Sequence, residues 1–269
     1  MLKHKRRVRY LSMLIVAILL SMFVFGCGSG NEVSQEETQG KEGDAANTKS
    51  ILIGVAGPFT GDAAYLGTGL KKTVELAFEE INDQGGVNGR KLEALFLDDK
   101  GDIKEAANVA TKLASNPDIF AVIGHVHSSC TLAALPIYQR AGLTCISASS
   151  SSPQITKMGY ENFLRVIPND NLQGVEMAKC AINTLGLKKI AILYANNDYG
   201  QGIKDVAADK IKELGGEVVA LEAYVPMVDK DFSPQLTKIK ASNAEAVMMV
   251  AEATEAGLIA RQAQNLGLG

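Results

Sequence analysis

Residues 51–99 decide the fold of this chain: ILIGVAGPFTGDAAYLGTGLKKTVELAFEEINDQGGVNGRKLEALFLDD. The apolar run Ile51–Gly57 is followed by proline and glycine, which is typical of a buried parallel strand that ends in a turn. Within residues 69–82, apolar side chains recur at helical spacing and give a helix one apolar face. Two glycines then end this helix, and residues 92–99 read as a second strand. The stretch therefore predicts a strand–helix–strand unit, half of a doubly wound sheet.

The same alternation continues to the end of the chain. Strictly alternating strands and helices imply parallel sheets with right-handed crossovers, so the fold class is α/β. A serine-rich connection separates four strand–helix units from three more, which indicates two lobes: residues 51–167 and residues 168–269. The crossing between them is expected near Arg165–Asn169. The further expected helices cover residues 102–115, 129–142, 172–186, 199–216, 231–242 and 252–267, and the further expected strands cover residues 119–125, 143–147, 163–168, 188–195, 217–225 and 244–251.

The first 26 residues are typical of a signal peptide. Several lysines and arginines precede an apolar run, Leu11–Phe25. As a helix this run would rise about 22 Å, short of a bilayer core of about 30 Å. Its end, Val24-Phe25-Gly26-Cys27, resembles a lipoprotein cleavage box, which would make Cys27 the lipidated N-terminus. The alternative is a short uncleaved anchor with an incidental cysteine.

Residues 27–50 have almost no apolar side chains and cannot pack a core, so they are predicted to form a flexible tether. The formal net charge is −3, and no basic cluster follows the signal peptide, which argues against nucleic acid as a partner. Cys130, Cys145 and Cys180 lie in apolar contexts where small buried thiols are common, and no disulfide is predicted.

The sequence of residues 57–99 resembles the N-terminal region of the leucine/isoleucine/valine-binding protein family. The members of this family are the receptor subunits of amino-acid importers of the ATP-binding-cassette type. The motifs GP-x-TG, ELAFEEIN, GG-x-NGRKL and a terminal DD carry the resemblance at consistent spacing. It implies a type I periplasmic-binding-protein-like fold, in which two lobes are hinged about a cleft. Because the chain stops after a helix, at Leu268-Gly269, the second lobe is expected to be incomplete.

Ligands of doubly wound folds bind outside the carboxyl ends of the strands. The loop after residues 119–125 contains Ser128 and Ser129, either of which is a natural N-cap, and a helix N-terminus suits a carboxylate. The resemblance assigns the ligand α-carboxylate to Ser128. We expect His127 to line the pocket wall. An alternative is a metal site formed by His125, His127 and Cys130, but no fourth ligand is evident.

The resemblance also assigns roles to residues of the serine-rich loop and to two tyrosines. Ser149 would offer its carbonyl to the ligand ammonium, and Ser151 its hydroxyl and N–H to the carboxylate; a plain solvated loop is the alternative. Tyr65 matches an aromatic residue that lines the site. Tyr199 matches the one that covers the ligand on closure, although a surface tyrosine at a helix start would look the same.

Two second-lobe carboxylates, Asp170 and Glu252, lie near strand or crossing ends and could meet an ammonium. By the resemblance, the carboxylate most often credited with that role would lie beyond Gly269.

No catalytic or cofactor motif is visible. Gly67-x-Gly69 lacks the third glycine of a dinucleotide fingerprint, and Ser128 beside His127 is a pair of sequence neighbours rather than a triad. We therefore expect a protein that is not an enzyme and needs no cofactor or metal.

The expected function is that of an extracytoplasmic substrate-binding lipoprotein, at the cell surface or in the periplasm. It would capture a small amino acid, with a branched-chain one favoured, and deliver it to a membrane permease of an ABC importer by hinge closure. The alternatives are a ligand-sensing receptor domain for another small carboxylate or amide, and an exported enzyme, for which no catalytic constellation is found.

Overall fold

The computed structural model describes residues 49–268, so the predicted signal peptide, Cys27 and nearly all of the tether lie outside the described part. The described residues belong to one unit. The strands are β1 (Ile51–Gly57), β2 (Leu92–Asp98), β3 (Ile119–Ile123), β4 (Thr144–Ser147), β5 (Phe163–Arg165), β6 (Lys189–Ala195), β7 (Glu217–Tyr224) and β8 (Ala246–Val250). The helices are α2 (Ala64–Asp83), α3 (Ile103–Ala114), α4 (Ser128–Ala141), α5 (Pro153–Lys157), α6 (Asp170–Lys179), the π-helical η1 (Cys180–Thr184), α7 (Asp198–Glu213), α8 (Ser233–Ala241) and α9 (Ala253–Asn265).

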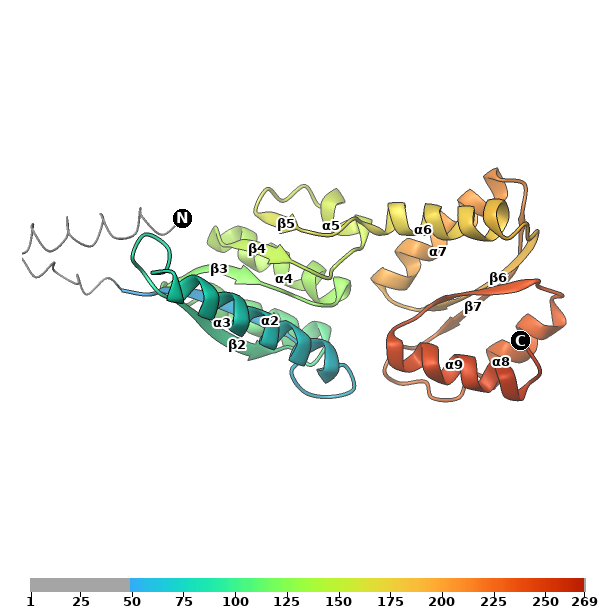
Figure 1. Ribbon diagram of the computed structural model, residues 1–269, viewed down its shortest axis with the longest axis horizontal. Helices are drawn as coiled ribbons and strands as arrows, with labels where there is room; N and C mark the ends of the chain where they lie inside the picture. Colours follow the sequence, from blue (N-terminus) through green and yellow to red (C-terminus); the bar gives the residue numbers. More distant parts are fainter. Residues whose placement is uncertain (1–48, 269) are drawn as a thin grey trace, which may run out of the picture. The chain divides into compact units, whose positions relative to one another are not determined.

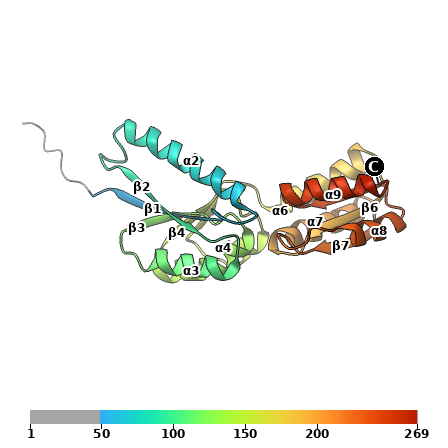
Figure 2. The same ribbon diagram turned by 90° about the horizontal axis from the view of Figure 1, so that it is seen from below.

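The first sheet is parallel throughout and has the strand order β2-β1-β3-β4-β5. Helices cover both of its faces, as Figure 2 shows, with α2 on one side and α3 and α4 on the other. Val74 of α2 packs on Ile53 and Val55 of β1, while Leu113 and Tyr138 of α3 and α4 belong to the core of the opposite face. Burial on both faces explains why β1 is a continuous apolar run instead of an alternating one.

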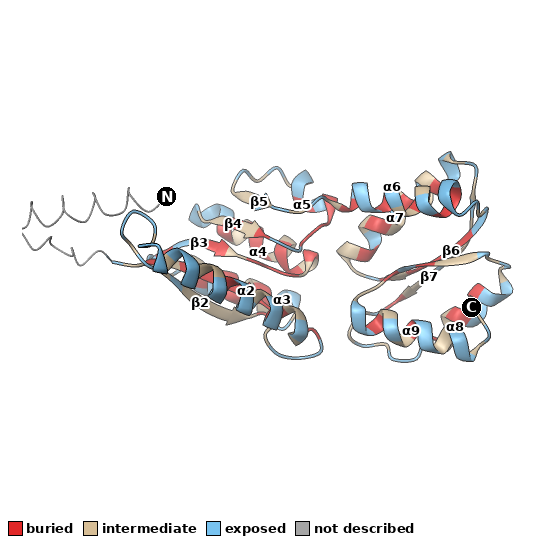
Figure 3. Ribbon diagram, in the orientation of Figure 1, coloured by how far each residue is buried: buried red, intermediate tan, exposed pale blue. Residues whose placement is uncertain are grey.

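The second sheet is also parallel and has the order β7-β6-β8. One core on it contains Ile203 and Ile211 of α7 together with residues of α6 and η1. The other contains Leu236 of α8 and Ile259 of α9. Figure 3 shows that the buried residues concentrate in β6 and on the inward sides of these helices. The predicted α/β class, with two parallel sheets, is confirmed.

The chain leaves the first sheet after β5 and enters the second part with α6, as Figure 1 shows. The predicted lobe boundary, between Ile167 and Pro168, lies in this connection and stays a prediction. We use "first lobe" for residues 51–167 and "second lobe" for residues 168–268.

Three local expectations differ from the structure. Residue 127, not Ser128 or Ser129, is the N-cap of α4, and its side chain makes no capping hydrogen bond. The helix expected over residues 172–186 widens into η1 from Cys180 onward. Cys180 is exposed, whereas Cys130 and Cys145 are buried as expected; all three thiols are free.

Candidate functional site

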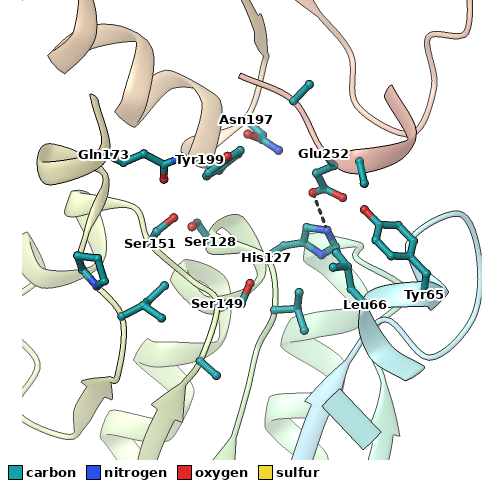
Figure 4. Close-up of a pocket in the computed structure, with 16 residues that line it drawn as sticks. Tyr65, Leu66, His127, Ser128, Ser149, Ser151, Gln173, Asn197, Tyr199 and Glu252 are labelled. Carbon is teal, nitrogen blue, oxygen red and sulfur yellow. Dashed lines mark ion pairs between the residues drawn. The ribbon is translucent and has the colours of Figure 1, made fainter. Parts of the chain in front are cut away.

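A cavity of about 460 Å³ lies where the carboxyl ends of strands from both sheets face each other (Figure 4). Because parallel strands deliver their C-terminal loops to one edge, residues far apart in the sequence meet here. Its wall is formed by Tyr65, Leu66, Val126, His127, Ser128, Ala148, Ser149, Ser151, Ile167, Pro168, Gln173, Asn197, Tyr199, Ala251, Glu252 and Ala253.

The first wall is the start of α4, directly after β3. The first backbone N–H that reaches an intrahelical acceptor is that of Thr131, which donates to the His127 carbonyl at 3.0 Å. The N–H groups of Ser128, Ser129 and Cys130 are therefore left without an intrahelical partner, as at every helix start. Together with the helix dipole they favour an anion at this end of the cavity.

The serine-rich loop after β4 forms the adjoining wall, and its own hydrogen bonds hold it in shape. The Ser147 hydroxyl accepts from the N–H groups of Ser149 at 3.2 Å and Ser150 at 2.9 Å. From the other side, Arg165 donates to the carbonyls of Ser150 at 3.1 Å and Ser152 at 3.0 Å. Within the described chain the Ser149 carbonyl and the Ser151 N–H have no protein partner, so both are available at the cavity wall.

Behind these two loops lies a buried network that sequence reasoning missed. The His125 Nδ1 atom is 2.6 Å from Asp99 Oδ2, and its Nε2 atom is 3.0 Å from the Tyr138 hydroxyl. The three side chains are buried and come from the end of β2, the end of β3 and the middle of α4. The network ties the loop that carries His127 and Ser128 to its neighbours.

The second lobe supplies the opposite wall. Asn197 caps α7 by accepting a hydrogen bond from the Gly200 N–H at 2.9 Å, and Tyr199 follows in the first turn. Glu252 precedes α9 at the end of β8. Figure 4 shows Tyr199 above Ser128 and Ser151, with Glu252 near Tyr65 and His127.

One ion pair crosses the cavity between the lobes. His127 Nε2 lies 3.0 Å from Glu252 Oε1, and the side chains are only 11% and 18% exposed. Neither ring nitrogen has a hydrogen-bond partner of good geometry among the described residues. Burial lowers the pKa of His127, but Glu252, Asp99 and Glu255 outweigh it, so the pKa is raised overall. The surroundings thus favour an imidazolium.

Both cavity tyrosines are held neutral. Burial, followed by the charge of Glu252, raises the pKa of Tyr65. Burial, followed by the charge of Asp170, raises the pKa of Tyr199. Each hydroxyl therefore remains a hydrogen-bond donor.

Asp170 does not lie on the cavity wall. It is fully buried at the first residue of α6, behind Ser151, whose carbonyl accepts a hydrogen bond from the Asp170 N–H at 3.0 Å. Burial raises the pKa of Asp170, although the Ser151 hydroxyl and Arg165 lie close enough to oppose the shift. Its carboxylate makes no hydrogen bond of good geometry. This arrangement does not support the predicted direct contact between Asp170 and a ligand.

The other predicted ligand residues line the cavity: Tyr65, His127, Ser128, Ser149, Ser151, Tyr199 and Glu252. The cavity is also lined by Leu66, Gln173 and Asn197, which sequence reasoning did not select. Asn197 could have been found, because it precedes the helix that carries Tyr199 in the N-cap position. Gln173 sits within α6 and has no sequence signal.

In the described chain, no cluster of His, Cys, Asp or Glu side chains could hold a metal ion. No described helix is both long and apolar enough to cross a bilayer.

A fold of parallel sheets with a cleft at their carboxyl ends defines a class of ligand-binding proteins, and comparison with known proteins identifies the family. Residues 50–269 match the Periplasmic binding protein family, and the chain belongs to it. This confirms the family resemblance expected from the sequence.

The curated relatives that the chain matches are named for the binding of amino acids. The "Leucine-, isoleucine-, valine-, threonine-, and alanine-binding protein" of Pseudomonas aeruginosa is 37% identical over 224 residues, which are 83% of this chain and 59% of the relative. An "Amino acid binding protein" of the same organism is 37% identical over 218 residues, 81% of this chain and 58% of that protein. The chain therefore spans about three fifths of the length of these curated relatives.

Among solved structures, the branched-chain amino acid transporter substrate-binding protein of Streptococcus pneumoniae, crystallised with isoleucine, superposes with a TM-score of 0.76. The sequence identity is 33%, over 82% of this chain and 62% of that one.

Proposed function

We propose that this chain is the ligand-capturing part of an extracytoplasmic substrate-binding lipoprotein, which takes a small amino acid, with a branched-chain one favoured, to the permease of an ABC importer. It acts by binding and not by catalysis. The relatives named for leucine, isoleucine and valine support this ligand class.

The observation that carries the proposal is that one cavity presents groups suited to a carboxylate and, separately, groups suited to an ammonium. Unpaired N–H groups at the start of α4, with the hydroxyls of Ser128 and Ser151, suit the α-carboxylate. The free carbonyl of Ser149 suits the ammonium, and Glu252 adds negative charge on the opposite wall. A zwitterion can bind to both sets of groups at once, whereas a simple anion or cation can bind to only one set.

Binding is proposed to work by hinge closure. The first lobe holds the α-groups, and the second closes over them with Tyr199. Only the difference between the ligand's affinities for the closed and open states can shift this equilibrium. Each charge-assisted hydrogen bond contributes about 1.5 to 3 kcal/mol, so a few suffice for micromolar binding.

Anchoring would follow from lipidation of Cys27 after removal of residues 1–26, with residues 27–50 as the tether. A second acyl signal makes such an anchor stable.

Thermal unfolding of residues 50–269 with leucine, isoleucine or valine tests the ligand class. Ligand at a hundred times its dissociation constant stabilises the folded state by about 2.7 kcal/mol. We expect a cooperative melt that rises by several degrees. Leucinamide, which lacks the carboxylate, and 4-methylpentanoate, which lacks the ammonium, are the matched controls and should shift it far less. A sharp melt that no amino acid moves would reject the ligand class.

A further inference from the structure

The contact between His127 and Glu252 joins side chains from opposite lobes. Among the described residues, such contacts include His127 with Glu252, Ser129 with Asp198 at 2.5 Å, and Lys230 with Asp62 at 2.8 Å. Only the first combines burial with a group that titrates near neutral pH, since an unperturbed histidine has a pKa of about 6.5.

The charged groups that act on the imidazole of His127 all favour its protonated form. Glu252 and Glu255 face it from the start of α9, Asp99 from the end of β2, and neutral Tyr65 from α2. No cation is among the charged groups that act on it. Burial alone would keep the ring neutral, so the proton is stabilised by carboxylates that include two from the second lobe.

The loop after β2 also lies against the imidazole, and a left-handed backbone favours glycine there. Gly101 has a φ of 72°, and a Cβ atom built on it would lie 3.0 Å from His127 Cε1 and 3.2 Å from Nδ1. The backbone of this loop is therefore in close contact with the ring. Because no hydrogen bond from the first lobe orients the ring, Glu252 is its one charged contact within ion-pair distance.

We propose that His127 and Glu252 form a proton-dependent latch, in which protonation of His127 stabilises the closed arrangement of the two lobes. The inference deepens the proposed function, since hinge closure is the step that the latch acts on. Opening would separate His127 from Glu252 and Glu255 and return its pKa toward the ordinary value. Closure therefore takes up a proton from the buffer.

The sign of the pH dependence follows from this linkage. The pKa of His127 is higher in the closed state than in the open state, so the latch is fully present below the open-state pKa. It is lost as the pH rises through the raised, closed-state pKa. Closure and ligand affinity should both strengthen on acidification, by up to tenfold for each pH unit between the two pKa values.

The first test needs no ligand. The chain without residues 1–26, carrying Cys27→Ser and Lys112→Cys, is labelled at residue 112 in the first lobe and at the exposed Cys180 in the second. Cys130 and Cys145 are buried and should not react. We expect the inter-lobe distance distribution to shift toward shorter values between about pH 8 and about pH 5.5.

Two variants test whether the pH-dependent shift in inter-lobe distance comes from His127 or from another titrating group. His127→Gln keeps a polar side chain of similar size but cannot be protonated, so the shift should vanish. Lys230→Gln breaks the exposed inter-lobe pair with Asp62 and should leave the shift intact. Circular dichroism at each pH verifies that the protein stays folded. A shift in His127→Gln as large as in the parent protein, or no shift in the parent, would overturn the latch.

Calorimetry with leucine then separates the latch from the proposed function. In buffers of different ionisation enthalpy, the parent protein should take up a fraction of a proton per leucine bound near neutral pH, and His127→Gln should take up none. Leucine binding without proton uptake overturns the latch and leaves the function standing. A pH-dependent distance without leucine binding supports the latch and rejects the ligand.

Discussion

At the start of α4, the Ser128 hydroxyl accepts a hydrogen bond from the Ser152 N–H at 3.2 Å and is almost fully buried. It therefore joins the two loops that would hold a carboxylate. We predict that Ser128→Ala weakens leucine binding by about 1 to 2 kcal/mol, or roughly five- to thirty-fold, because a charge-assisted hydrogen bond is lost and the loop is loosened. Titration calorimetry measures the change.

Ser115→Ala is the matched control, because Ser115 is an exposed serine whose hydroxyl donates to the Thr111 carbonyl at the end of α3. Affinity should stay unchanged in that variant. Equal affinities for Ser128→Ala and the parent protein would contradict the assignment of the carboxylate to this wall.

The buried network behind the site predicts an effect on stability. In Tyr138→Phe the ring remains, but His125 Nε2 loses its hydroxyl partner at 3.0 Å and stays buried. We expect the free energy of unfolding in urea to fall by about 1 to 2 kcal/mol. Tyr160→Phe is the control, because the Tyr160 hydroxyl has no protein partner within the described chain, and it should change little. A loss of equal size in both variants would mean that the network contributes nothing.

Single residues show how far sequence reasoning reaches. Ser128 could be placed near the cavity because it follows the end of a parallel strand, whereas Tyr65 and Tyr199 were placed there by the family resemblance. Asp99, His125 and Tyr138 could not be grouped, because 26 and 13 residues separate the partners and nothing local marks the pairs. For Asp170, sequence position indicated the crossing between the lobes but not that the side chain is fully buried there.

Among the elements, β2 ends on Asp98, whose carboxylate fastens the loop between β1 and α2. Oδ1 accepts from the N–H groups of Phe59 at 2.7 Å and Lys100 at 2.9 Å, and Oδ2 accepts from the Thr60 hydroxyl. Burial opposes ionisation, but these hydrogen bonds outweigh it and lower the pKa of Asp98. Their contribution to stability is present above the ordinary pKa and is lost as the pH falls through the lowered one.

We predict that Asp98→Asn lowers the free energy of unfolding at pH 7 by about 1 kcal/mol, a small value because the carboxylate is partly exposed. At about pH 3 the difference from the parent should shrink, since Asp98 is then increasingly protonated. Urea titrations at both pH values measure this. Asp83→Asn, an exposed aspartate at the end of α2, serves as the control. A deficit that does not shrink in acid would contradict the role of the ionised form.

Elements were predicted well where periodicity is long and poorly where it is short. The helices α3, α4 and α9 and the strands β6 and β7 lie within two residues of the expected bounds. By contrast, α5 has five residues, too few for a helical period, and was not expected. The widening of α6 into η1 depends on packing between elements, and the sequence pattern carries no sign of it.

For the whole molecule, the predicted anchor is tested by Cys27→Ser. When the full chain is expressed in a bacterium that processes lipoproteins, the parent should partition with membranes and incorporate labelled fatty acid. Cys27→Ser should do neither. Cys180→Ser, which removes an exposed thiol of the folded unit, should behave like the parent. Membrane association that survives in Cys27→Ser would favour the uncleaved anchor.

The hydrogen bonds made by Arg165 and by the Ser147 hydroxyl determine which parts of the cavity wall are formed by backbone atoms instead of side chains. By occupying alternate backbone groups of the serine-rich loop, they leave a fixed set of main-chain atoms at the cavity wall. Point mutation cannot delete a peptide carbonyl in the way it deletes a hydroxyl, and only a change to proline removes a backbone N–H. The part of the wall that would bind the α-carboxylate and α-ammonium groups, which all amino acids share, is therefore little affected by substitution of side chains. Substitution at positions such as Leu66, which also lines the cavity, can still change which ligand side chain is accepted.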